Sequence, residues 1–176
     1  IVGIYHYSQT GQMFNVSPIL VYLTAYVYMN LGAFAVVILA EDMTGDNIDG
    51  YAGMGTRYPL LAFMLTVFLL SLAGLPPLAG FIGKFFIFGE IVNASYYVLV
   101  ILAVLNSVIS VYYYFRIVHF MYFVPHPDGD KKPVYSYSIL TLAAMYICFA
   151  GTIFMGIKPN WIVELASRAL IIIDLR

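Results

Sequence analysis

Long apolar runs alternate with short polar segments along this chain. Four stretches carry no charged residue, namely 7–40, 58–83, 91–115 and 133–157. Each is longer than the about 20 residues that an α-helix needs to cross the hydrocarbon core of a bilayer. The pattern therefore predicts an all-α fold, a polytopic membrane helix bundle of about four spans, with residues 1–176 forming a single membrane domain.

Turn-forming residues between the apolar runs set the expected limits of the helices. We predict spans over 18–40, 96–120 and 135–157, with loops rich in Gly, Pro and charged residues over 41–58 and 124–133. The first five residues are interpreted as the end of another helix, followed by a polar loop. The tail over 159–176 starts with Pro159 and carries Trp161, which favours an amphipathic or interfacial helix with Trp161 at the level of the headgroups.

The apolar stretch over 59–94 is too long for one continuous span. An unbroken helix of this length would measure ~50 Å at about 1.5 Å per residue, against a hydrocarbon core of ~30 Å. Prolines lack a backbone donor and clash with the preceding turn, and glycines relax the backbone. The break is therefore expected at Gly74, Pro76, Pro77, Gly80 and Gly83.

Two arrangements of this stretch satisfy the break. One is a tight hairpin of two short spans, 59–75 and 77–94. The other is a single span made of two half-helices joined by unwound backbone. Lipid does not satisfy exposed backbone amides, so the second arrangement requires that the break be buried in protein or face water.

Composition supports a membrane protein and excludes other classes. The 176 residues are 62% hydrophobic and 10% charged, against roughly 45–50% and 25% in soluble domains. A net charge of −1 without clustered Lys and Arg argues against a nucleic-acid partner. The single cysteine, Cys148, lies in an apolar run and is expected to pack there. Because the chain starts at Ile1 without Met or a signal-peptide pattern, we expect an internal fragment or an incompletely represented chain.

Lys84 is the first candidate for chemistry. It lies in the apolar stretch beside the predicted break, where an isolated ammonium costs ~3 kcal/mol or more. Burial penalises the charged form of an amine, so that proton exchange comes within physiological reach, as a proton relay requires. The alternative is a lysine that extends its stem to the headgroups. The depth of Lys84 in either arrangement favours the relay.

Four further polar residues are candidates for a proton pathway: Glu90, Asn106, Tyr114 and Arg116. Glu90 follows Lys84 by six residues, so the two do not share a helix face, and a solvated carboxylate at the interface is the simpler interpretation. Tyr114 and Arg116 belong to the sequence "YYYFR", which we interpret first as an interfacial aromatic belt.

Signatures of soluble enzymes and metal sites are absent from the sequence. "GFIGK" lacks the strand–loop–helix context of a phosphate-binding loop. No pair of histidines is placed to hold a haem between helices. His119 and His126 have no further His or carboxylate at ligand spacing, so no metal site is predicted.

The motifs "YMNLGAFAVV", "LSLAGLPPLAGFIGKFFIF" and "NSVISVYYYFRIV" occur in this order. Together they resemble the antiporter-like membrane subunits of respiratory complex I (NADH-quinone oxidoreductase), most closely subunit N, called subunit 2 in mitochondria. The likeness extends over nearly the whole chain, which would represent the C-terminal third or so of such a subunit. The lysine of "GFIGK" favours subunit N over the related subunit M, in which a glutamate is expected at this place.

This resemblance implies a fourteen-helix subunit with two inverted five-helix repeats, each containing one broken helix. The present spans would be helices eleven to fourteen, and 59–94 would be the second broken helix, which favours one interrupted span over a hairpin. Lys84 would belong to a row of buried lysines and a glutamate linked by water through the membrane centre. The glutamate–lysine pair and the central lysine of the first repeat have no counterpart in this chain, which would therefore form a half-channel only.

The function implied is that of a proton-translocating membrane-arm subunit of an NADH:quinone oxidoreductase, a multi-pass protein of the bacterial plasma membrane. Its partners would be the lipid bilayer and the other membrane-arm subunits. NADH, flavin, iron–sulfur clusters and quinone are expected in partner subunits, with no cofactor and no redox-active residue in this chain. The alternatives are a subunit of a multi-subunit cation/proton antiporter or of a membrane-bound hydrogenase, and a purely structural membrane anchor.

Overall fold

The computed structural model describes residues 16–45, 47–126 and 138–174. These residues form helices and no strand, which confirms the all-α prediction. The predictions for residues 1–15, for most of the loop over 124–133 and for the last two residues of the tail lie outside the described ranges. The elements in order are α2 (Ser17–Thr44), η1 (Ile48–Tyr51), α3 (Met54–Arg57), α4 (Pro59–Ala73), α5 (Ala79–Asn93), α6 (Tyr97–Phe123), α7 (Ile139–Ile157) and α8 (Pro159–Asp174).

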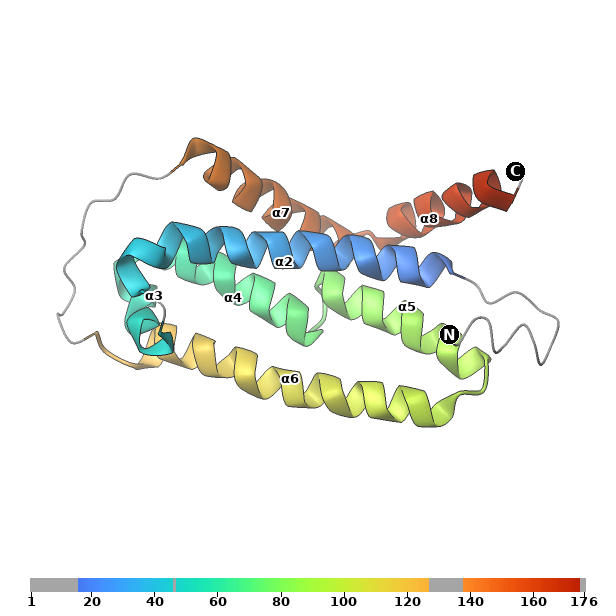
Figure 1. Cartoon of the computed structure of the whole chain (residues 1–176), viewed down its shortest axis with the longest axis horizontal. Helices are drawn as coiled ribbons and strands as arrows, with labels where there is room; N and C mark the ends of the chain where they lie inside the picture. Colours follow the sequence, from blue (N-terminus) through green and yellow to red (C-terminus); the bar gives the residue numbers. More distant parts are fainter. Residues whose placement is uncertain (1–15, 46, 127–137, 175–176) are drawn as a thin grey trace.

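Within the described ranges, three helices are long and apolar enough to cross a membrane: α2, α6 and α7. A fourth passage is made by α4 and α5, which lie end to end and run in the same direction between α2 and α6 (Figure 1). Each of the two has 15 residues and is therefore about 22 Å long, too short to cross the core alone. The prediction of one interrupted span, rather than a hairpin, is confirmed.

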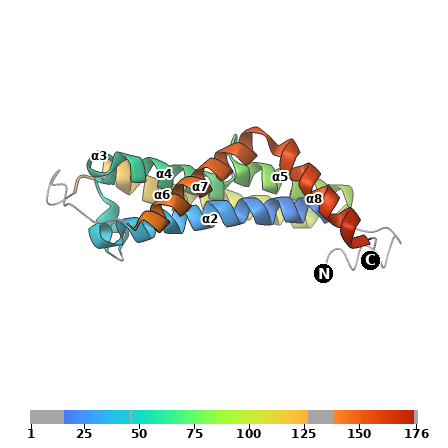
Figure 2. The ribbon, with the colours of Figure 1, turned by 90° about the horizontal axis from the view of Figure 1, so that it is seen from above.

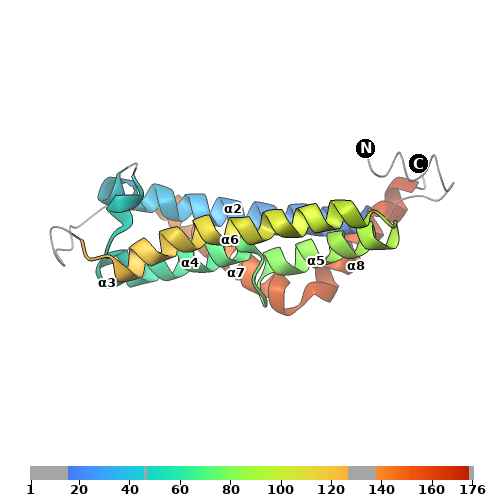
Figure 3. The same cartoon turned by 90° about the horizontal axis from the view of Figure 1, so that it is seen from below.

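The helices pack around α2. Its buried residues contact the broken pair on one side and α7 on another, where Met29, Phe68 and Met145 meet in one apolar cluster. Figure 2 shows α7 crossing over α2 and continuing into α8, and Figure 3 shows α6 on the opposite side of the bundle. Small residues permit close approach, because a side chain on Gly32 would enter the ring of Phe68.

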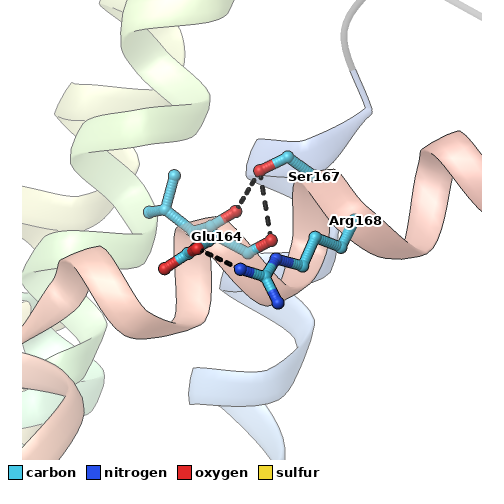
Figure 4. Close-up of polar contacts among 4 residues, drawn as sticks. Glu164, Ser167 and Arg168 are labelled. Atoms are coloured by element: carbon cyan, nitrogen blue, oxygen red, sulfur yellow. Dashed lines mark hydrogen bonds and ion pairs between the residues drawn. The ribbon is translucent and has the colours of Figure 1, made fainter.

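The C-terminal helix α8 is amphipathic, as predicted. Ile162 and Ala166 are buried against α2 in a second apolar cluster. On the exposed face, Arg168 forms an ion pair with Glu164 at 2.5 Å, and the Ser167 hydroxyl donates to backbone carbonyls of its own helix (Figure 4). The position of α8 at the membrane interface stays a prediction.

Several helix ends differ from the predicted limits. The helix α2 extends past Ala40 to Thr44, and Gly45 ends it with φ +59 and an N–H that donates to the Glu41 carbonyl at 2.9 Å. The predicted end of this helix was set by its first acidic residues. Such residues indicate where the apolar environment ends, whereas the helical hydrogen bonds of α2 continue beyond that point. The rest of the loop predicted over 41–58 folds in part into η1 and α3.

Candidate functional site

The interruption between α4 and α5 is a tight turn. Gly74 adopts φ +89, a left-handed conformation that favours glycine, and its N–H donates to the carbonyls of Leu70 at 3.1 Å and Ser71 at 3.0 Å. The chain then turns through Pro76 and Pro77, both exposed, before α5 begins. The turn therefore lies where the prolines and Gly74 were expected to place it.

The other two glycines of the predicted break lie in α5 and serve close packing. Gly80 is buried against the carbonyl of Ser71 in α4, and Gly83 is buried against Tyr22 of α2. A Cβ on Gly83 would come within 3.1 Å of the Tyr22 Cα. These glycines therefore bring the first turns of α5 close to α4 and α2.

Lys84 reaches back from α5 to the end of α4. Its Nζ donates to the carbonyl of Leu72 at 3.0 Å and to that of Ala73 at 3.2 Å. Its side chain lies over Gly74, where an added Cβ would be 3.2 Å from Nζ. The carbonyl end of a helix carries a partial negative charge, which stabilises a cation placed there. Lys84 is half-buried rather than fully buried in the described part of the chain.

A partly polar cavity of about 450 Å³ opens beside Lys84, between α2, α5 and α6. On α6 its polar lining recurs every three or four residues and therefore forms one stripe. The polar residues of the lining are Tyr22, Tyr26, Lys84, Asn106, Ser107, Ser110, Tyr113 and Tyr114.

The candidate pathway residues fall into two groups. Asn106 and Tyr114 line the cavity beside Lys84. Glu90 instead lines a separate cavity of about 260 Å³ near the start of α2, so Lys84 and Glu90 lie on different faces of α5, as their spacing predicted. Arg116 is exposed on α6 and does not belong to the described lining of either cavity.

Sequence reasoning did not assign several residues of the cavity wall to a pathway. Tyr22 and Tyr26 are one helical turn apart on α2, with ring centroids 5.8 Å apart, and both face the cavity. Tyr113 and Tyr114 also line it, whereas Tyr112 is 77% exposed. The signal that would have found them is the spacing of polar residues by three or four along each helix.

Lys84 also borders an apolar groove of about 530 Å³ between the end of α4, α5 and α6. Phe85, Val104 and Val108 are among the apolar residues that line this groove. Lys84 therefore borders both a polar cavity and an apolar groove. Proton exchange between its amine and water is favoured on the side of the polar cavity only.

Metal-ligating side chains are dispersed in the described ranges. No group of three or more His, Cys, Asp and Glu there is close enough to hold a metal ion. Cys148 is buried in the apolar cluster around Met29 and Phe68, which is the packing role expected of it.

Comparison with known proteins places these residues in a family context. Residues 4–110 match a transmembrane family described as NADH:quinone oxidoreductase/Mrp antiporter. The chain is 42% identical over 163 residues to NADH-quinone oxidoreductase subunit N of Trichlorobacter lovleyi, covering 92% of this chain and 33% of that protein. It is 39% identical over 164 residues to F(420)H(2) dehydrogenase subunit N of Methanosarcina mazei, covering 88% of this chain and 33% of that protein.

A solved structure agrees with these sequence similarities. Respiratory complex I from Thermus thermophilus with bound aureothin contains a chain with a TM-score of 0.61 and 25% identity, covering 80% of this chain and 34% of that one. The chain therefore spans 33–34% of the length of these relatives.

Proposed function

Because this chain belongs to the NADH:quinone oxidoreductase/Mrp antiporter transmembrane family, we propose that it forms part of a proton-translocating subunit of type N. This subunit would lie in the membrane arm of an NADH:quinone oxidoreductase. The observation that carries the proposal is Lys84, an amine bonded to the carbonyl end of one half-helix and bordering a polar cavity.

The hydrogen-bond donors and acceptor of the Lys84 amine allow it to exchange a proton without a change in its position. The ammonium form has three N–H donors, and the carbonyls of Leu72 and Ala73 take two of them. The third is left for the cavity. The neutral amine has two N–H donors and one lone pair, so it keeps both carbonyl contacts and offers an acceptor in the third position. Protonation therefore changes what Lys84 presents to the cavity without requiring the side chain to move.

The cavity supplies partners for that exchange. Its 450 Å³ leave room for several water molecules, and Asn106, Ser110 and Tyr114 offer hydrogen-bonding groups along one side. A proton would pass between Lys84 and this hydrated stripe of α6. Glu90 and Arg116 do not line this cavity, so their part in a pathway would require contacts with the rest of the subunit.

The energy for proton movement would come from electron transfer in partner subunits. NADH, flavin, iron–sulfur clusters and quinone would bind there, and this chain would hold no cofactor. Charge changes in neighbouring membrane-arm subunits would alter the balance between the charged and neutral forms of Lys84. The names of the bacterial relatives support a location in the bacterial plasma membrane.

Replacing Lys84 tests this proposal. In the complete complex, Lys84→Met should lower donor-driven turnover by more than about two-fold, because loss of a proton-transfer group slows that step by ~10²-fold or more while other subunits limit the overall loss. The matched control is Lys158→Met, which removes an exposed lysine at the junction of α7 and α8. Unaltered turnover in Lys84→Met at equal amounts of assembled complex would remove the role of Lys84.

A cation/proton antiporter subunit is the second candidate, because the matching family also includes the Mrp antiporters. A membrane-bound hydrogenase subunit is a related possibility. Purification of the assembly through a tag on this subunit separates them: flavin and iron–sulfur subunits should accompany a subunit of complex I, and an antiporter should bring none. A purely structural anchor would tolerate Lys84→Leu without loss of turnover.

A further inference from the structure

The two half-helices are joined by hydrogen bonds that run in opposite directions across the break. Lys84 of α5 donates to the last carbonyls of α4. In return, the hydroxyl of Ser71 in α4 accepts a hydrogen bond from the backbone N–H of Gly80 in α5 at 3.0 Å. Ser71 is 0% exposed, so no water competes for this contact.

The Ser71 hydroxyl replaces a cap that α5 lacks. The residue before α5 is Leu78, which provides no side-chain hydrogen bond, although the first backbone N–H groups of a helix have no partner inside it. Ser71 satisfies the N–H of Gly80 from the neighbouring half-helix. Its own proton is donated to the Met29 sulfur of α2 at 3.5 Å, so the hydroxyl is used in both directions.

Gly80 and Lys84 are four residues apart and therefore share one face of α5. That face is turned toward the end of α4, because Gly80 bonds to Ser71 and Lys84 bonds to Leu72 and Ala73. A small shift of α5 at Gly80 would change the distance from the Lys84 amine to those carbonyls.

We propose that Ser71 is a positioning residue for proton transfer at Lys84. Its hydroxyl holds the first turn of α5 against the end of α4 and thereby keeps the Lys84 amine within reach of the carbonyls of Leu72 and Ala73. This inference rests on the proposed function of Lys84 and adds to it a residue that does not itself line the polar cavity.

The test is Ser71→Ala in the complete complex, alone and combined with Lys84→Met. Leaving a buried N–H unpaired disfavours the joined geometry by about tenfold. We therefore expect donor-driven proton translocation to fall by about two- to five-fold in Ser71→Ala, with normal assembly. In the Lys84→Met background, Ser71→Ala should cause no further loss, because the residue acts through Lys84. Thr24→Val is the matched control, since its hydroxyl donates at 2.8 Å within α2 only.

Three results would overturn the inference. Ser71→Ala could leave translocation unchanged, or its loss could add in full to that of Lys84→Met, which would indicate a general packing defect. A complex that fails to assemble with Ser71→Ala, while Thr24→Val assembles, would show that the hydroxyl is needed for folding rather than for placing Lys84. An effect of Lys84→Met with none of Ser71→Ala would reject this inference and leave the proposed function standing, whereas no effect of Lys84→Met would reject the proposed function itself.

Discussion

Two features of the structure favour glycine at position 74, and both involve Lys84. Its φ of +89 ends α4 so that the carbonyls of Leu72 and Ala73 remain available to the amine. Its missing side chain leaves space for the lysine, because an added Cβ would be 3.1 Å from Lys84 Cδ and 3.2 Å from Nζ. The conformation of Gly74 therefore leaves the two acceptor carbonyls available, and its lack of a side chain leaves space for the Lys84 side chain that donates to them.

Gly74→Ala should destabilise the subunit by about 1–2 kcal/mol, because an L residue is strained in the left-handed conformation. It should also slow proton translocation, since the methyl group displaces the lysine stem. The matched control is Gly89→Ala in α5, where an added Cβ meets nothing within 4 Å and alanine favours the helix. Thermal unfolding and proton uptake of the complete complex measure both effects. Equal behaviour of the two variants would contradict this account of Gly74.

Tyr114 tests the polar stripe on α6. Tyr114→Phe removes a hydroxyl from the cavity wall and should lower proton translocation by about two-fold, the effect expected from loss of about one hydrogen bond. Tyr112→Phe removes a hydroxyl from the exposed side of the same helix and should have no effect. If the two variants behave alike, whether both slow translocation or neither does, the proton does not use this stripe.

Glycine residues allow the helices to pack closely against one another. Gly32 of α2 lies against the ring of Phe68, a fully buried residue of α4, and Gly156 of α7 lies against the carbonyl of Pro77 in the turn. Contacts of this kind hold α2 and α7 against α4 and α5. They matter because the hydrophobic effect does not drive helix association within lipid. The break is therefore supported from its two neighbours as well as by its own hydrogen bonds.

Gly32→Ala should destabilise the subunit by roughly 1–3 kcal/mol, the cost of overpacking a filled interior. Phe68→Leu makes room at the same contact, so the double variant should be more stable than the sum of the two single losses predicts. Thermal unfolding of the purified complex provides the measurement. Strict additivity would show that the two residues do not meet as described.

Periodicity and turn residues predicted the elements better than their ends or their mutual contacts. The run of apolar residues over 59–94 was too long for one span, and Pro76 and Pro77 located its interruption correctly. The end of α2 at Thr44 was missed, because acidic residues indicate the limit of the apolar environment rather than the limit of the helix. The contact of Ser71 with Gly80 depends on the turn geometry, which no local pattern encodes.

The bundle as a whole places the break near the middle of the length of α2 (Figure 1). The helix α2 has 28 residues and is about 42 Å long, which exceeds the ~30 Å hydrocarbon core of a bilayer. The similarity to subunit N expected from the three sequence motifs is confirmed by the relatives at 39–42% identity. The motifs carried that prediction, because composition alone indicates only a membrane bundle.

The most direct test of the central claim is the rate of donor-driven proton uptake by proteoliposomes that contain the complete complex. Wild type, Lys84→Met and Lys158→Met are compared at equal amounts of assembled complex. If Lys84 carries the proton at the helix break, uptake is more than about two-fold slower in Lys84→Met and unchanged in Lys158→Met. Equal uptake by Lys84→Met and wild type would contradict the account.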